Sequence, residues 1–592
     1  GTGVKHSFYQ VMDYNGTEWR ANSSHGFFND NFTSVIHPEW TIVSGTWSIS
    51  GGRLLQSNQS LVNTNIYANV TQQSGNIYLY HWQMKISGTG TNRRAGMHFF
   101  CSDPTADGRG NSYMVYLRAD NNTVQIYKYV NNSYSSGGGY YVTQNFTINA
   151  NQWYDVKVLL NTNTGKIDVY VDNILAATTT DTSPFTAGTA ISLRAGECLA
   201  EYDDVKVYVS RSTNVNVTAG LNSSKEIRYQ SVSSSQESGR IRTLLIDNNN
   251  NWSTSYAENI FTDFTNPETN FNVNGEWQTV NFQINFNDSD ELSGIEKRFY
   301  SVSDFNGTKW TANAERGFAY NNFDSEIGAE WTQQVGTWNI SNGALVQTNE
   351  SEGNSNIWAY LKQNLSNRYL YEFDLKIEGS GTNRRGGFHY FASDPTQTNR
   401  GNGYFIWFRH TTQQLEFYKV TDNVFSLEKY YNISLNLGQW YNIKLVYDRI
   451  TGEHFVYMDN NLVGEYKDEN PYQIGDYVSF RSGNSLMSVD NFRVLRTRYP
   501  DVTISMGDAN SDIRYQSLNS TTYSAKIYSI VSDSAKNISA ISQQSIKTDW
   551  TAPVMVANVN DGLGADIDTT YVLNSISANW TASSDLQSGI QA

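Results

Sequence analysis

The 592 residues carry a net charge of −15, with 17% charged and 14% aromatic side chains. So many aromatic residues can bury ample surface, which excludes an intrinsically disordered chain, and the composition argues against a helical bundle. The acidic balance argues against a nucleic-acid partner, and no apolar run approaches the roughly 20 residues of a membrane span. Aromatic and β-branched residues separated by polar turn residues favour an all-β protein.

An internal repeat of about 290 residues organises the chain. Gly90-Thr91-Asn92-Arg93-Arg94 returns as Gly381-Thr382-Asn383-Arg384-Arg385, and Ile227-Arg228-Tyr229-Gln230-Ser231 returns as Ile513-Arg514-Tyr515-Gln516-Ser517. The offset between the copies falls from 291 to 286 along the chain, as small deletions in surface loops would produce. The sequence therefore predicts two similar units in tandem.

Each unit contains a long run of predicted strands, at 23–210 and again at 314–497. Period-two alternation is clear at 76–83, 111–118 and 166–171, with turn residues between the runs. So many antiparallel-type strands in roughly 185 residues favour a two-sheet jelly roll in each unit.

The segments before and after the second jelly roll, 263–313 and 498–548, each hold too few strands for a β-sandwich. Together they have about seven, the number of an immunoglobulin-like (Ig-like) domain. We therefore predict that each jelly roll is inserted in an Ig-like module; two small β modules in series are the alternative. The predicted domains are an Ig-like module without its opening strands (1–22 and 211–262), jelly roll 1 (23–210), a second Ig-like module (263–313 and 498–548), jelly roll 2 (314–497) and the start of a fibronectin-like module (549–592). We expect either a segment of a longer array or chains that join head to tail, the tail of one completing the head of the next.

The segments 26–32, 87–101 and 109–113 resemble concanavalin A-like modules of large secreted proteins of Bacteroidota. The segments 550–553, 558–562 and 578–583 look like the start of a fibronectin-like repeat of the same proteins. Such proteins resemble cell-surface adhesins exported by the type IX secretion system. The resemblance implies an extracellular, cell-surface location and names no catalytic residue.

Paired carboxylates on one strand face would indicate a glycanase. Glu372 and Asp374 have this spacing, but their counterparts in the first copy are His81 and Gln83, which cannot perform the same acid and base chemistry. No nucleophile elbow, zinc-binding motif or phosphate loop appears. We therefore expect no enzyme activity.

A polar and aromatic strand face is the predicted glycan-binding site, because flat rings stack on sugars and bidentate groups bind hydroxyls. The strand 113–118 alternates, so that Tyr113, Val115 and Leu117 share one face and Tyr116 and Arg118 the other. The structural alternative is that loops cover this face of the sandwich, so that it binds no ligand. For His98 and His389 the alternative is that both side chains are buried. The candidates are Tyr116, Arg118, Tyr127 and His98 in the first roll, and Trp407, Arg409, Tyr418 and His389 in the second.

Calcium is the predicted cofactor, because Asx oxygens occur in the first and last strands of each roll, which often pair, and hard oxygen donors suit this ion. The candidate ligands are Asp30 and Asp203 in roll 1 and Asn321 and Asp490 in roll 2, and ordinary Asx turns are the alternative. Similar modules often hold calcium between these strands. We also predict a disulfide between Cys101 and Cys198, because Cys101 ends one predicted strand, Cys198 precedes another, and the resemblance implies an exported protein.

Together these patterns indicate a non-catalytic extracellular repeat protein, an adhesin or surface-filament segment whose lectin-like jelly rolls bind glycans weakly and multivalently. The expected partners are a surface polysaccharide and further copies of the chain, with no nucleic acid. The alternative is a glycan-binding accessory region of a secreted polysaccharide-degrading enzyme.

Overall fold

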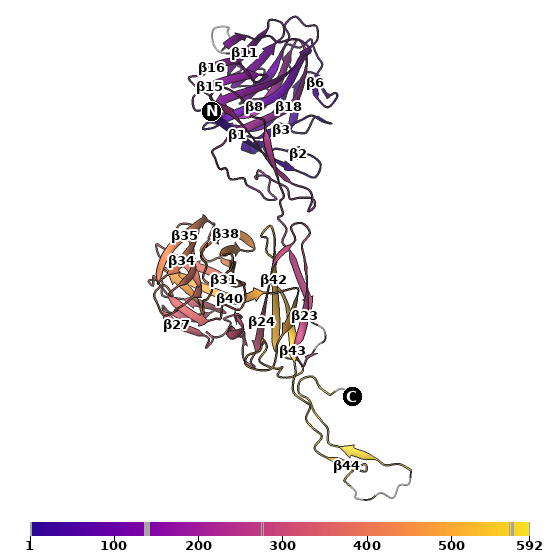
Figure 1. Cartoon of the computed structure of the whole chain (residues 1–592), viewed down its shortest axis with the longest axis vertical. Helices are drawn as coiled ribbons and strands as arrows, with labels where there is room; N and C mark the ends of the chain where they lie inside the picture. Colours follow the sequence, from indigo (N-terminus) through magenta and orange to yellow (C-terminus); the bar gives the residue numbers. More distant parts are fainter. Residues whose placement is uncertain are drawn as a thin grey trace. The chain divides into compact units, whose positions relative to one another are not determined.

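The computed structural model describes residues 3–590 except 135–141, 274, 276, 567, 568 and 570–573. They form strands joined by turns, with two short 3₁₀ helices at Ser23–His25 and Ala314–Arg316. The prediction of an all-β protein built of jelly rolls and Ig-like strands is confirmed. Two compact units, Gly1–Phe264 and Thr265–Ala592, each contain one jelly roll (Figure 1). No helix in the described part of the chain has the length and apolar character that crossing a membrane demands.

Two antiparallel sheets form the first jelly roll. The strand order of one sheet is β16 (Ile174–Thr180), β15 (Lys166–Val171), β14 (Trp153–Asn161), β8 (Ile77–Ser87) and β18 (Leu199–Ser210). The other has the order β12 (Ser133–Tyr134), β11 (Thr123–Val130), β10 (Ser112–Arg118), β9 (Arg94–Cys101), β17 (Ala187–Gly196), β7 (Asn65–Gln73) and β4 (Trp40–Ser44), and β13 (Val142–Asn145) also pairs with β11. The short strands β3 (Phe28–Asp30) and β6 (Leu54–Gln56) pair with β18, and β5 (Trp47–Ile49) pairs with β6.

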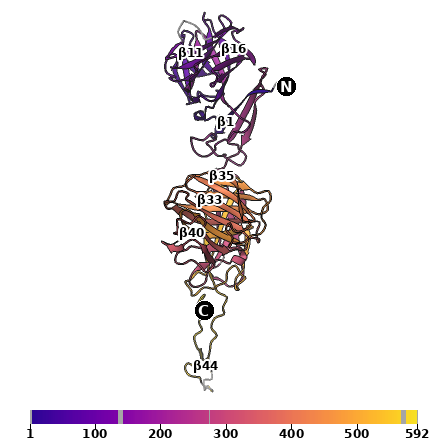
Figure 2. The same ribbon diagram turned by 90° about the vertical axis from the view of Figure 1, so that its left-hand side faces the viewer.

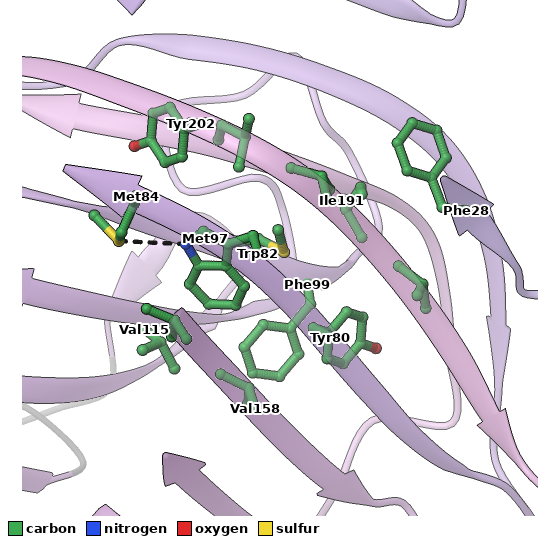
Figure 3. Close-up of a cluster of buried hydrophobic side chains, with 14 of the residues drawn as sticks. Phe28, Tyr80, Trp82, Met84, Met97, Phe99, Val115, Val158, Ile191 and Tyr202 are labelled. Atoms are coloured by element: carbon green, nitrogen blue, oxygen red, sulfur yellow. Dashed lines mark hydrogen bonds between the residues drawn. The ribbon is translucent and has the colours of Figure 1, made fainter. Parts of the chain in front are cut away.

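The core of this roll lies between the two sheets and follows from the period of two in its strands. Tyr80, Trp82 and Met84 of β8 point toward Met97 and Phe99 of β9, and all five are fully buried (Figure 3). The indole of Trp82 donates to the sulfur of Met84 at 3.3 Å, which satisfies its N–H inside the core. Each such side chain contributes roughly 1.5–3 kcal/mol by leaving water.

The second jelly roll repeats this arrangement. One sheet has the order β38 (Asn461–Lys467), β37 (Glu453–Met458), β36 (Trp440–Asp448), β31 (Arg368–Glu378) and β40 (Leu486–Thr497). The other has the order β35 (Val424–Asn432), β34 (Gln414–Thr421), β33 (Gly403–Arg409), β32 (Arg385–Ala392), β39 (Tyr477–Gly483), β30 (Asn356–Tyr360) and β27 (Trp331–Val335), with β33 and β35 labelled in Figure 2. The short strands β26 (Ala319–Asn321) and β29 (Ala344–Gln347) pair with β40, and β28 (Trp338–Ser341) pairs with β29.

Strands from before and after the second roll pair with each other in one sandwich. β24 (Ile295–Phe305) pairs with β42 (Ala525–Asp533) in one sheet, and β23 (Phe282–Ser289) pairs with β41 (Asp501–Ile504) in the other. Residues of both segments share one core around Ile284, Val302 and Ile527. β40 pairs with β24 as well as β31, so the sheet of the roll continues into the sandwich. The remaining strands of this module are β21 (Glu268–Asn272), β22 (Trp277–Gln278), β25 (Trp310–Thr311) and β43 (Ser542–Thr548).

The first unit has the corresponding strands of one sheet. β1 (Val4–Tyr14) pairs with β18, β19 (Gly239–Asp247) and β2 (Trp19–Arg20), and β20 (Tyr256–Ile260) pairs with β19. Residues 215–218 are the counterpart of β41 but form no strand, because no described strand of this unit takes the place of β23. At the other end of the chain, β44 (Val559–Asp561) and β45 (Ala578–Trp580) form a two-stranded hairpin.

The repeated Ile-Arg-Tyr-Gln-Ser sequence has a structural role in both units. The guanidinium of Arg514 donates to both carboxylate oxygens of Asp304 on β24, at 2.8 and 2.9 Å, and its backbone N–H donates at 3.0 Å. Arg228 bonds Asp13 of β1 in the same way, at 2.6, 2.9 and 2.9 Å. Each bidentate pair fastens the segment after a jelly roll to the strand before it.

The prediction of a disulfide between Cys101 and Cys198 is wrong, since both cysteines are free and buried. The Sγ of Cys198 donates to the carbonyl of Arg94, the first residue of β9, whereas Cys101 is its last residue. Seven residues at about 3.3 Å each separate these positions by about 23 Å, and a disulfide needs Cα atoms less than about 7 Å apart. Burial raises the pKa of Cys101 to about 12 and that of Cys198 to about 11, so both thiols stay protonated.

Candidate functional site

The predicted glycan-binding residues of each roll lie on one face of a sheet, opposite the core. In the first roll Tyr113, Val115 and Leu117 pack in the core, whereas Tyr116 clusters with Tyr127 outside it, as the alternation predicts. We call this outer surface of β9, β10, β11 and β17, and of β32, β33, β34 and β39 in the second roll, the polar face. His98, Arg118 and Tyr127 share it with Tyr116, and His389, Arg409 and Tyr418 share it with Trp407.

The central rings of the polar faces are not open platforms. Tyr116 is only 2% exposed and Trp407 only 4%, which contradicts the expectation that they stack directly on a sugar. Two guanidinium groups cover each ring. The Cζ atoms of Arg94 and Arg194 lie 5.8 and 5.5 Å from the Tyr116 ring centre, and those of Arg385 and Arg481 lie 5.0 and 5.4 Å from that of Trp407.

Register explains this covering. Gly96 lies directly between Tyr116 and Arg194 in adjacent strands, and Gly387 lies in the same way between Trp407 and Arg481. Because glycine has no side chain, the guanidinium can extend across the gap toward the ring. The signal for these arginines was present in the sequence, since Arg94 and Arg194 both recur in the second copy, but alternation along one strand could not show that they meet.

Both candidate histidines are buried, as the structural alternative for them stated. His98 is 0% and His389 1% exposed. Nδ1 of His98 lies 3.0 Å from the hydroxyl of Ser112, and His389 packs against Phe405 with ring centres 4.1 Å apart. Burial, with nearby arginines second, holds the pKa of each well below its usual value, so both imidazoles are neutral.

The rim of the polar face carries a similar triad in both rolls, in which an arginine and a tyrosine contact one side-chain oxygen, by an ion pair from Arg409 and by a hydrogen bond from Arg118. Arg409 Nε lies 2.9 Å from a carboxylate oxygen of Glu416, which also accepts a bond of 2.7 Å from Tyr418. In the first roll the amide oxygen of Gln125 accepts from Arg118 at 3.4 Å and from Tyr127 at 2.9 Å. Burial and the neighbouring Glu416 raise the pKa of Tyr418. Arg118, Arg409 and Tyr418 are partly exposed, so the rim rather than the ring meets solvent.

The calcium candidates lie on paired first and last strands, because β3 pairs with β18 and β26 with β40. Two of the candidates, Asp30 and Asn321, already hydrogen-bond to other groups of the protein. Asp30 accepts hydrogen bonds from Phe32 N–H and Trp40 Nε1, both 2.8 Å, and lies 2.9 Å from His37. Asn321 accepts from Phe323 N–H at 2.8 Å and donates to Glu330 at 3.1 Å. These are the Asx turns that were the alternative at these two positions.

The other two calcium candidates, Asp203 and Asp490, lie where the last strand shifts register, in β18 against β8 and in β40 against β31. Asp203 lies 3.8 Å from Arg53. Burial, with Asp374 and Asp324 adding repulsion, raises the pKa of Asp490 to about 6. Calcium at these positions stays a prediction.

We expect Asp490→Asn to raise the melting temperature of the metal-free protein at pH 7.5, and most of this gain to be lost at pH 4. A carboxyl group whose pKa is raised by folding destabilises the fold as pH rises from 3.8 through about 6, because the folded state resists ionisation. The measurement is calorimetry at both pH values, with the exposed Asp501→Asn as the matched control. A gain that is the same at pH 4 and 7.5 would contradict this account.

Glu372 and Asp374 do not form an exposed catalytic pair. Glu372 is buried and forms ion pairs of 3.4 Å with both Lys444 and Arg493, while Asp374 accepts a hydrogen bond of 2.9 Å from Asn491. Their positions on β31 therefore serve the packing of the sheet.

A cleft of about 650 Å³ in the first unit, where its jelly roll meets the Ig-like strands, was missed by sequence reasoning. Its lining includes Trp19, Asn29, Lys206, Arg240 and Arg242. The counterparts of Asn29 and Arg242 in the second unit are tyrosines. Their rings stack with centres 5.9 Å apart and fill the corresponding space. This difference between the copies was the available signal.

No protein-family model and no curated protein matches the chain. Among solved structures, the carbohydrate-binding module CBM66 from Bacillus subtilis is 19% identical, and the match covers 28% of this chain and 93% of that one, with a TM-score of 0.24. The carbohydrate recognition domain of Emp47p is 16% identical over 31% of this chain and 96% of that one, with a TM-score of 0.25. A β-glucanase from Bacillus licheniformis is 14% identical over 31% of this chain and 99% of that one, with a TM-score of 0.25.

Proposed function

We propose that the chain is a non-catalytic carbohydrate-binding repeat protein, a segment of an extracellular adhesin or surface filament that contacts glycans through the polar faces of its two jelly rolls. The observation that carries this proposal is the recurrence of the rim triad. An arginine and a tyrosine contact the same side-chain oxygen in both rolls, of Gln125 in the first and of Glu416 in the second, where the arginine contact is an ion pair.

The triad suits sugar recognition because it presents planar groups with fixed hydrogen-bonding directions. A guanidinium offers a fork of donors that sugar oxygens accept, and the edge of a tyrosine ring packs on C–H groups. Gln125 or Glu416 holds both side chains in place, so that little conformational freedom is lost when a sugar binds.

Two similar faces in one chain favour attachment to a repeating ligand. Once one roll is bound, the second contact is intramolecular, and avidity can exceed either single affinity by about 10²–10⁴. Weak single sites then suffice. The resemblance to type IX-secreted repeat proteins supports the cell-surface location that this role requires.

The test is binding of the full chain to a panel of immobilised polysaccharides, measured by biolayer interferometry. We expect the double variant Arg118→Ala/Arg409→Ala to lose about tenfold or more in apparent affinity, since each hydrogen bond to a charged group contributes about 1.5–3 kcal/mol. Arg53→Ala is the matched control, because its guanidinium also lies over an aromatic ring, 4.5 Å from the centre of Trp153, but on the other sheet.

Two results would contradict the proposal. Release of new reducing ends from a bound polysaccharide would show an enzyme. Unchanged affinity of the double variant alongside a weakened Arg53→Ala variant would move the site to the opposite sheet.

A further inference from the structure

Four arginines of the polar face recur in the two copies. Arg94, Arg109, Arg118 and Arg194 of the first roll correspond to Arg385, Arg400, Arg409 and Arg481 of the second. The ring beneath them is not retained, since Tyr116 is replaced by Trp407. The repeat therefore preserves the positive charge of this face more strictly than its aromatic side chain.

Two of the four arginines in each roll have ion-pair or hydrogen-bond partners within that roll. Arg118 forms an ion pair with Asp120 at 2.8 Å, and Arg409 one with Glu416 at 2.9 Å. Arg109 is 1% exposed and donates to oxygens of Ser192, Asn63, Asp107 and Thr64. Arg400 makes the equivalent bonds, so both buried arginines serve to hold loops in place.

The guanidiniums that cover the ring lack a counter-ion. In the described part of the chain no carboxylate lies within 4 Å of Arg94, Arg194, Arg385 or Arg481, whereas Asp120 and Glu416 pair with Arg118 and Arg409. Arg94 donates to the carbonyls of Asn92 and Val62, and Arg481 donates to the amide oxygen of Asn399 at 3.1 Å. A partly buried charge without a counter-ion is costly.

In the second roll the two covering guanidiniums repel each other. Burial, followed by repulsion from Arg385, lowers the pKa of Arg481 to about 9. In the first roll burial also acts to lower the pKa of Arg194, but Tyr116 and Tyr129 around it raise that pKa above its ordinary value. An incoming anion would relieve the repulsion between Arg385 and Arg481.

We propose that the paired guanidiniums over Trp407, and in the same way those over Tyr116, bind the carboxylate or sulfate group of an acidic polysaccharide, with the rim triad contacting the neighbouring sugar. This inference rests on the proposed glycan-binding function and assigns its ligand class. The net charge of −15 makes non-specific attraction to a polyanion unfavourable, so binding of this kind has to be local.

The experiment uses the full chain with polygalacturonate, dextran sulfate and neutral dextran as probes, in affinity electrophoresis. We expect one or both acidic probes to retard the chain. Because polygalacturonate carries carboxylates and dextran sulfate carries sulfates, the difference between the two retardations distinguishes a carboxylate ligand from a sulfate ligand. Arg385→Gln/Arg481→Gln is expected to weaken that retardation at least tenfold, Arg94→Gln/Arg194→Gln to weaken it as well, and Arg53→Gln to leave it unchanged.

Melting temperature distinguishes a lost contact from a lost fold. Because Arg385→Gln/Arg481→Gln removes two charges that repel each other, we expect its ligand-free melting temperature to stay the same or rise. If this variant unfolds, Arg481→Lys replaces it, since lysine keeps the charge but loses the planar fork.

Three outcomes separate this inference from the proposed function. Equal binding of neutral and acidic probes would overturn the acidic ligand and leave glycan binding intact. Retardation by acidic probes that none of the arginine variants reduces would show attraction elsewhere on the chain and would also overturn it. Binding to no polysaccharide in the wider panel would overturn both.

Discussion

Asp304→Ala is expected to destabilise the second Ig-like sandwich by about 3–5 kcal/mol, the usual cost of breaking a buried ion pair by removing one partner. Asp304 is fully buried. Its carboxylate accepts three hydrogen bonds from Arg514 and a further one of 3.0 Å from Thr311. Removing it leaves the Arg514 guanidinium half-buried without a counter-ion and its backbone N–H without this acceptor.

The pair is expected to matter beyond its own contacts, because it joins β24 to the segment that follows the inserted jelly roll. The measurement is calorimetry of the full chain, in which the transition of the sandwich should move to lower temperature. Asp501→Ala, an exposed aspartate on β41, is the control and should shift it little. Arg514→Met added to Asp304→Ala should restore part of the loss, since the uncompensated charge is then gone. Equal shifts for Asp304→Ala and the control would refute this role.

Trp407→Ala is expected to cost about 3–5 kcal/mol of stability in the second jelly roll, the range for removing a fully buried large aromatic side chain. The indole is 4% exposed, packs edge-on against Phe405 with ring centres 4.6 Å apart, and lies beneath the guanidiniums of Arg385 and Arg481. The variant leaves a cavity and removes the ring on which the two positive charges lie.

Trp440→Ala is the matched control, because Trp440 belongs to the same roll and also lies under a cation, with Lys376 Nζ 5.4 Å from its ring centre, but is 41% exposed. Its loss should change stability by less than about 1 kcal/mol. The readout is the denaturant midpoint of each variant. If Trp407→Ala instead keeps the midpoint of the wild type and only weakens glycan binding, the indole is an accessible platform after all.

Local patterns in the sequence predicted much of the fold. Alternation along 113–118 placed Tyr113, Val115 and Leu117 in the core and Tyr116 outside it, because successive side chains of a strand point to opposite faces. The strand count of the two flanks led to the expectation of nesting, and the pairings of β24 with β42 and of β23 with β41 join those flanks. Comparison of the two copies of the repeat also identified the arginines that occur in both.

The sequence by itself therefore determined the all-β class, the duplicated unit and the face on which each candidate side chain lies, because these follow from a period of two and from counting. Only the tertiary structure decided that Trp407 is covered. The covering guanidiniums come from β32 and β39, which are far apart in the chain but pair so that Gly387 of β32 lies between Arg481 and Trp407. It also separated Cys101 from Cys198, which lie near opposite ends of one strand. Both outcomes depend on which strands become neighbours and in what register, and pairing between distant segments is decided by the packing of the whole sheet rather than by any local pattern.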